Sequence, residues 1–98
     1  MKAGVIVGAS DKKIEELYKA IISINDINTC KAFFEDLCTY KEIDNMALRV
    51  ETAKKLIKGE TYEEIIKDTD ISSATLSRVS RCVKHGKGYI KVLKDDNK

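Results

Sequence analysis

The sequence predicts an all-α protein. Apolar residues recur at helical spacing along nearly all of its 98 residues, proline is absent, and glycine occurs only five times. Short polar or glycine-containing breaks divide this pattern into six helical segments. The content of 43% apolar and 35% charged residues suits a small, well-solvated helical domain. We therefore expect one six-helix domain over residues 11–94, between a flexible leader (1–10) and a charged tail (95–98).

The first three helices are expected in the N-terminal half. One runs from Asp11 to Ile24 with a wide apolar stripe of Ile14, Leu17, Tyr18, Ile21 and Ile22. Asn28 can cap a second helix, whose apolar residues are Cys30, Phe33, Phe34, Leu37 and Cys38. Thr39, with Glu42 three residues later, forms a capping box that opens a longer helix ending at Lys58-Gly59.

Residues 61–85 have the pattern of a helix-turn-helix. The first segment, about Tyr62 to Lys67, starts with the capping box Thr61–Glu64 and is expected to bury Ile65 and Ile66. The break Thr69-Asp70-Ile71-Ser72 is short, polar and anchored by Ile71. Ser72 or Ser73 can cap the second segment, and Gly86 can close it as a C′ glycine. A final short helix is expected at about Tyr89 to Leu93.

The second segment separates apolar from cationic residues. Leu76, Val79 and Val83 fall on one face of a helix, whereas Arg78, Arg81 and Lys84 recur every three residues on a flank away from it. In a helix-turn-helix the N-terminal residues of the second helix lie against base edges. Here these residues are Ser73, Ala74, Thr75 and Ser77, three with a hydroxyl group and one with a methyl that can contact thymine.

The charge distribution favours nucleic acid as the partner of this segment. Residues 1–70 contain 11 Lys+Arg against 14 Asp+Glu, whereas residues 71–98 contain seven against two. The positive end of the chain therefore coincides with the proposed reading helix, as phosphate attraction requires. The alternative is an ordinary helical hairpin whose cationic face is merely solvated.

Other functional classes have little support in the sequence. No apolar run reaches about 18 residues, so no membrane span is expected. The single His85 lies at a glycine-flanked helix end without a nucleophile pattern, which disfavours an enzyme. The three cysteines lack C-x-x-C spacing, which predicts reduced, mostly buried thiols in a cytoplasmic protein. No metal site or cofactor is expected. A zinc site formed by one cysteine and His85 is poorly supported. Val5-Ile6-Val7 can form a strand, but without a partner strand a flexible leader is favoured.

The apolar residues of the first two helices exceed what a chain of this length can easily cover. A two-fold dimer would bury them and would present two reading helices to successive major grooves, about 34–36 Å apart. The alternative is that they fill a compact monomeric core.

Several blocks in this order resemble the trp-repressor-like family, and more closely its YerC/YecD-type group. They are Phe34-Glu35-Asp36-Leu37-Cys38-Thr39, Arg49-Val50, Leu56-Ile57-Lys58-Gly59-Glu60, Thr61-Tyr62-Glu63-Glu64-Ile65 and Ala74-Thr75-Leu76-Ser77-Arg78-Val79-Ser80-Arg81-Cys82. The resemblance covers about residues 12–94. It implies an intertwined, all-helical homodimer that binds palindromic operator DNA as a transcriptional regulator.

The resemblance also implies roles for individual residues. Base-facing positions of the family fall on Ser73, Ala74 and Ser77, and phosphate-side positions on Ser80 and Lys84, while Arg81 has no dependable counterpart. The corepressor-holding threonine and two arginines of the tryptophan repressor fall on Thr39, Arg49 and Arg78. However, Val79 replaces a glycine that makes room for the indole ring, and Cys82 replaces a serine that helps to receive the ligand's amino group.

These two departures predict that L-tryptophan is not the ligand and that Val79 fills the altered pocket, so no small-molecule effector is expected. Placing extra side-chain atoms in a site that is already well packed costs about 1–3 kcal/mol of free energy. Arg49 and Arg78 would then have a surface or phosphate-contacting role. The rival to a DNA-binding regulator is a protein-interaction module that binds acidic side chains with its cationic helix.

Overall fold

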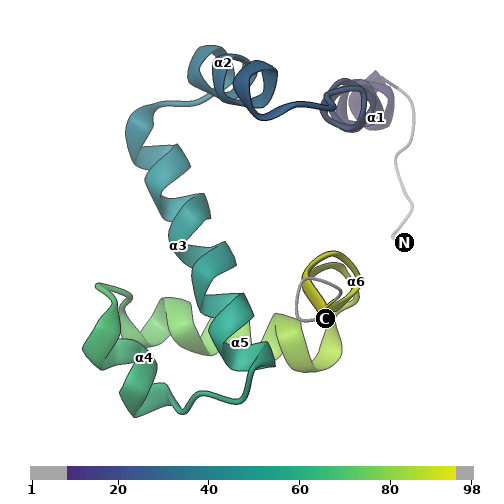
Figure 1. Ribbon diagram of the computed structural model, residues 1–98. Helices are drawn as coiled ribbons and strands as arrows, with labels where there is room; N and C mark the ends of the chain where they lie inside the picture. The colour runs from purple at the N-terminus through teal and green to yellow at the C-terminus, as the bar shows by residue number, and fades with distance from the viewer. Residues whose placement is uncertain (1–8, 95–98) are drawn as a thin grey trace. The chain divides into compact units, whose positions relative to one another are not determined.

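The computed structural model describes residues 9–94, and within them the chain is helical, without β-strands. The helices labelled in Figure 1 are α1 (Ala9–Ile22), α2 (Ile27–Leu37), α3 (Tyr40–Ile57), α4 (Tyr62–Asp68), α5 (Ser73–His85) and α6 (Gly88–Leu93). The predicted all-α class is thus confirmed. The strand considered at Val5–Val7 and the charged tail lie outside the described residues, as does most of the predicted leader, although its last two residues already belong to α1. The chain forms two compact units, Met1–Thr39 and Tyr40–Lys98.

The helices of the first unit begin earlier than predicted. α1 starts at Ala9 instead of Asp11, and it ends at Ile22, where the Ser23 hydroxyl donates a 2.7 Å hydrogen bond to the Ala20 carbonyl. The cap of α2 is Asp26, and the prediction of Asn28 was wrong. The Asp26 carboxylate accepts a 2.8 Å hydrogen bond from the Thr29 backbone N–H, and an anion at this helix end also meets the positive pole of the helix dipole.

Neither helix of the first unit has a covered apolar face. Phe33 and Phe34 pack edge to face, with ring centroids 5.9 Å apart, but α2 contains no buried residue. On α1, Tyr18 is 60% exposed and Ile22 80% exposed. Ile14, Leu17, Ile27 and Leu37 are exposed as well. These side chains form an apolar surface that the unit does not cover itself.

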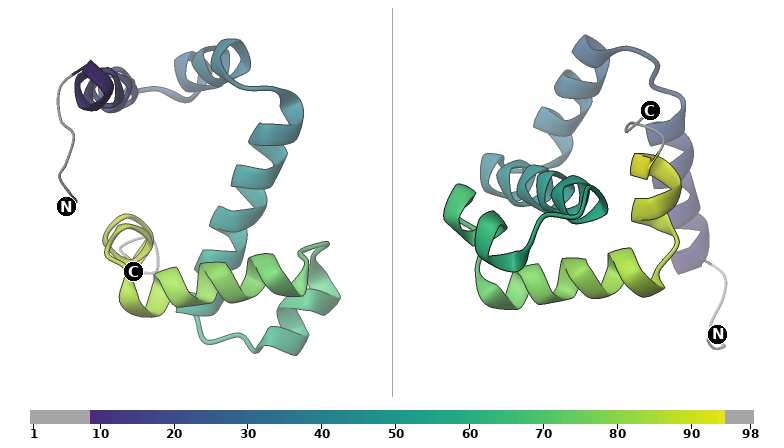
Figure 2. Two further views of the ribbon diagram at one scale, coloured as in Figure 1. Left: turned by 180° about the vertical axis from the view of Figure 1, so that it is seen from behind. Right: turned by 60° about the horizontal axis from the view of Figure 1, so that its bottom comes forward.

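The second unit is organised by α3. α5 crosses the C-terminal end of α3, α4 lies beside this crossing, and α6 follows from the far end of α5 (Figures 1 and 2). One core cluster joins Ala53 of α3, Val79 of α5 and Leu93 of α6. A second cluster joins Ile65 of α4 to Ile71 and Leu76, and Leu56 of α3 packs against both clusters. Through this packing α3 holds α4, α5 and α6 in one unit.

The turn from α3 to α4 is a Schellman motif, and it sets where α4 begins. Gly59 has φ +97°, its N–H donates to the Leu56 carbonyl, and the Glu60 N–H donates to the Lys55 carbonyl. The side chains of Lys55 and Glu60 also form a partly buried ion pair, with Nζ and Oε1 3.7 Å apart. The predicted end of this helix at Lys58-Gly59 is therefore correct.

Candidate nucleic-acid interface

The helix-turn-helix consists of α4, a four-residue turn and α5, as predicted. α4 is opened by the capping box: the Thr61 N–H donates to the Glu64 carboxylate (2.8 Å), and the Glu64 N–H donates to the Thr61 hydroxyl (3.2 Å). At the other end, the Thr69 hydroxyl donates to the Ile65 carbonyl at 2.8 Å and accepts from the Ile71 N–H at 3.3 Å. Because Ile71 is only 5% exposed, the turn is anchored in the core.

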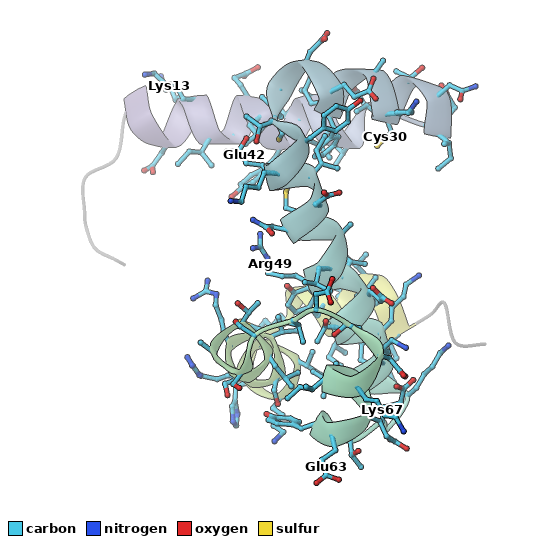
Figure 3. The ribbon with its side chains drawn as sticks, turned by 90° about the vertical axis from the view of Figure 1, so that its left-hand side faces the viewer. Lys13, Cys30, Glu42, Arg49, Glu63 and Lys67 are labelled. Atoms are coloured by element: carbon cyan, nitrogen blue, oxygen red, sulfur yellow. The ribbon has the colours of Figure 1, made fainter. Side chains whose placement is uncertain are left out.

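One residue of α4 does not lie where the sequence predicted. Ile65 is fully buried, but Ile66 is 45% exposed, so the expected burial of Ile66 was wrong. A seven-residue helix turns only one narrow face to α3 and α5, and successive residues point about 100° apart. The exposed Glu63 and Lys67 project away from this helix in Figure 3.

The start of α5 is held by Ser72. Its hydroxyl oxygen accepts from the Thr75 N–H at 3.2 Å, and the hydroxyl donates to Thr75 Oγ1 at 3.0 Å. Ser72, and not Ser73, is therefore the cap. The Thr75 hydroxyl oxygen accepts this bond from Ser72, and the Thr75 side chain is half-buried. In this conformation Thr75 positions the helix, while Ser73 and Ala74 stay exposed ahead of it.

The exposed side of α5 carries most of the residues predicted to contact DNA. Ser73, Ala74, Ser77, Arg78, Arg81 and Lys84 are all exposed. The opposite side is the core: Leu76 and Val79 are 1% exposed, and Val83 packs against the cluster of Ala53, Val79 and Leu93. Ser80 departs from the prediction, because it is 3% exposed and belongs to the buried side. A phosphate contact by Ser80 is incompatible with this burial.

The charged side chains of residues 71–94 are all cationic. No aspartate or glutamate occurs between Ile71 and Lys94. The ion pairs that involve Lys19, Lys31 and Lys55 all lie on α1, on α2 or at the end of α3. The exposed face of α5 therefore combines small hydroxyl and methyl groups near its N-terminus with three cations further along.

A family model described as Trp repressor protein matches residues 12–97 of this chain. The chain belongs to this family. It is 44% identical over 75 residues to YerC, an uncharacterized protein of Bacillus subtilis (strain 168), and the match covers 76% of this chain and 72% of YerC.

Solved structures agree with this family assignment. A Trp repressor candidate from Staphylococcus aureus matches with a TM-score of 0.83 at 35% identity, covering 99% of this chain and 95% of the other. A TrpR-like protein from Eubacterium eligens ATCC 27750 matches with a TM-score of 0.82 at 39% identity, covering 88% and 90%. The resemblance inferred from the sequence blocks is thereby confirmed.

The Trp repressor resemblance predicted an altered ligand pocket around Val79. In the structure Val79 is 1% exposed and packs with Ala53 and Leu93, so its side chain lies inside the core of the second unit. Arg49 projects from the middle of α3 and is half-buried, whereas Arg78 is exposed on α5 (Figure 3 labels Arg49). Thr39 belongs to the first unit and directly precedes α3, which begins where the predicted capping box places it.

An apolar groove beside α5 and α6 was not predicted from the sequence. It encloses about 520 Å³ and is lined by Val50, Cys82, Gly86, Gly88, Tyr89, Val92 and Leu93. Val50 and Val92 are exposed apolar residues on its rim. Two of its lining residues, Gly86 and Gly88, are glycines, and the sequence pattern predicts Gly86 only as a C′ glycine.

The interpretation of Gly86 needs correction. Its backbone is extended, with φ −88° and ψ −176°, so it is not the left-handed residue that a C′ glycine implies. Glycine is needed for space, because a Cβ at this position would lie 2.7 Å from the Cys82 carbonyl oxygen.

The structure also bears on the predictions about metals, thiols and membranes. Among residues 9–94, no group of three or more His, Cys, Asp or Glu side chains is placed to hold a metal ion. Cys30, Cys38 and Cys82 are free thiols of intermediate burial. Within the same range, no helix has both the length and the apolar content that a bilayer crossing requires.

Proposed function

We propose that this protein is a sequence-specific, DNA-binding transcriptional regulator that acts as a homodimer. The observation that carries the proposal is the exposed face of α5, where Ser73, Ala74 and Ser77 stand ahead of Arg78, Arg81 and Lys84 on a helix that the core holds from behind. Membership of the Trp repressor family supports it. In a bacterium such a regulator works in the cytoplasm, where the chromosome lies.

Each part of this face has a distinct role in the proposal. Ser73, Ala74 and Ser77 meet base edges in the major groove, through hydroxyl hydrogen bonds and a methyl contact with thymine. Arg81 and Lys84 contact phosphates, which fixes the position of the helix without reading sequence. Arg78 also lies on this face. Thr75 acts indirectly, by holding the first turn of α5 through its bonds with Ser72.

A homodimer explains two apolar surfaces that one chain leaves open. One is the exposed apolar surface of α1 and α2, and the other is the groove around Val50, Tyr89 and Val92. Burying such surfaces between two chains removes apolar area from water. Two-fold symmetry would then present two α5 helices to half-sites about 34–36 Å apart, which corresponds to a palindromic operator.

L-Tryptophan is not a corepressor in this proposal. Val79 carries a side chain where the tryptophan repressor keeps a glycine, and this side chain is buried in a packed cluster. Admitting an indole ring beside it would require the cluster to open, at a cost of about 1–3 kcal/mol or more. Isothermal titration should therefore show no micromolar binding of L-tryptophan.

In-vitro selection from random duplex DNA, with and without L-tryptophan, tests the function. A palindromic motif enriched equally in both arms is the expected result. Enrichment only with tryptophan would restore the corepressor model. If no motif emerged even at low salt, the protein-interaction module would become the better explanation.

Two protein variants, measured on the selected DNA motif, separate the phosphate contacts of α5 from its base contacts. Lys84→Ala should weaken binding about equally on all sequences and reduce the salt slope by about 1.8, for one lost phosphate contact in each subunit of the homodimer. Ser77→Ala should instead change the preferred sequence and leave the salt slope as it is. Lys58→Ala, at an exposed lysine outside the helix-turn-helix, serves as the charge-matched control. Parental affinity of Lys84→Ala at low salt would refute the phosphate assignment.

A further inference from the structure

A second cationic surface lies on α6, outside the helix-turn-helix. Lys91 lies in α6, Lys87 is its N-cap and Lys94 its C-cap, so the three are spaced by four and three residues, and all are exposed. At about 100° per residue their side chains fall within an arc of roughly 60°, so they form one row along the helix. We call these three residues the α6 lysine row.

Core packing fixes the orientation of the α6 lysine row. Leu93 is 7% exposed and belongs to the cluster with Ala53 of α3 and Val79 of α5, and Tyr89 packs against the same cluster. By the same rotation per residue, Tyr89 lies about 170° and Leu93 about 130° around the helix from the middle of the row. The lysines therefore face away from the core, and α6 is held against the helix that carries Arg81 and Lys84.

Within residues 71–94 no acidic residue lies beside this row in the sequence, and the acidic pair Asp95 and Asp96 comes only after Lys94. Residues 71–94 contain six Lys or Arg and no Asp or Glu. Unlike Lys19, Lys31 and Lys55, the three lysines of the row have no ion pair with the described residues. A solvated helix face usually mixes both signs, whereas a run of one sign next to a reading helix attracts a polyanion.

We propose that the α6 lysine row is a second phosphate-contacting surface, which adds sequence-independent contacts to the DNA backbone beyond those made by α5. The inference rests on the proposed DNA-binding function and goes beyond it, since it assigns contacts to a helix outside the helix-turn-helix. Arg81 and Lys84 precede the row along the chain, so the cations continue from α5 across the Gly86 turn into α6. DNA is favoured over an acidic protein because of this continuity.

If the α6 lysine row contacts phosphates, it should account for a measurable part of the salt dependence of DNA affinity. Each neutralised phosphate contributes about 0.9 to the slope of log K against log salt, so three contacts in each subunit of the homodimer contribute about 5.4. Between 50 and 200 mM salt, the parent homodimer should therefore lose about 1,800-fold more affinity than a variant without the row. The loss should be equal on the selected motif and on a shuffled duplex, because phosphates carry no sequence information.

The test compares four full-length proteins by fluorescence anisotropy on both duplexes across this salt range. The first is the parent, and the second replaces Lys87, Lys91 and Lys94 by glutamine. The third replaces Lys12, Lys13 and Lys41 by glutamine, which removes the same charge from exposed positions on α1 and α3. The fourth carries Lys→Arg at the three row positions, and it should keep the parental slope.

The outcomes distinguish this inference from the proposed function. A lower slope in the row variant alone, with circular dichroism unchanged, is the expected result. A parental slope in the row variant would overturn the inference, while the DNA-binding function would stand. An equal drop in the control variant would show a general charge effect and also overturn it. A parent without salt-dependent DNA binding would overturn the proposed function together with the inference.

Discussion

Thr52, in the middle of α3, offers a direct test of the packing in the second unit. The residue is 0% exposed, and its hydroxyl oxygen has no hydrogen-bond partner among residues 9–94. Because the side chain is already covered within one chain, a second chain cannot supply a partner. A buried hydroxyl without a partner costs about 1–3 kcal/mol relative to water. We therefore expect Thr52→Val to stabilise the protein.

The magnitude follows from what the substitution changes. Valine has nearly the same shape and a similar helix propensity, so the main effects are relief of the unpaired hydroxyl and burial of one more methyl group. Together these should add about 1–3 kcal/mol to the free energy of unfolding. In a chain of 98 residues, each 1 kcal/mol raises Tm by about 4–8 °C.

The assay is thermal and urea unfolding followed by circular dichroism, with all variants at one protein concentration because a dimer's Tm depends on it. Thr69→Val is the matched control. The Thr69 hydroxyl donates to the Ile65 carbonyl and accepts from the Ile71 N–H, so the same substitution there should destabilise by about 1 kcal/mol. A neutral or destabilising Thr52→Val would refute the reasoning, since it would mean that the hydroxyl has a partner.

Three further predictions concern turns and caps. Gly59→Ala should lower the free energy of unfolding in urea by about 1–2 kcal/mol, because Gly59 has φ +97°. A Cβ there would meet no atom within 4 Å, so the cost comes from the backbone conformation alone. Gly59→Asn should cost less, because asparagine tolerates a positive φ better. Gly86→Ala should lower Tm, since the Cβ would meet the Cys82 carbonyl oxygen at 2.7 Å, whereas Gly88→Ala, with open space around it, should be neutral or stabilising. Hydrogen bonds from the Thr29 backbone and side chain lower the pKa of Asp26 from its ordinary value of 3.8. The stability that this carboxylate contributes is therefore present above about pH 4 and lost at lower pH, so Asp26→Asn should show a smaller loss of Tm between pH 5 and pH 2.5 than the parent.

The sequence by itself determined the features that depend on a few neighbouring residues. The capping box of Thr61 and Glu64, the helix end at Gly59 and the apolar face of Leu76, Val79 and Val83 were all predicted correctly. Caps and helical periodicity act within about four residues, so a single stretch of chain contains the information they need. The family blocks also lie in such stretches.

Only the tertiary structure decided how far the covered side of each helix extends. Ser80 is buried and Ile66 exposed, both against expectation, because the positions of α3 and its neighbours set how wide the covered face of α5 and of α4 is. The same packing leaves the Thr52 hydroxyl without a partner and opens the groove beside Tyr89. These features arise from contacts between residues distant in the sequence, and such contacts are not encoded in the local pattern of any one helix.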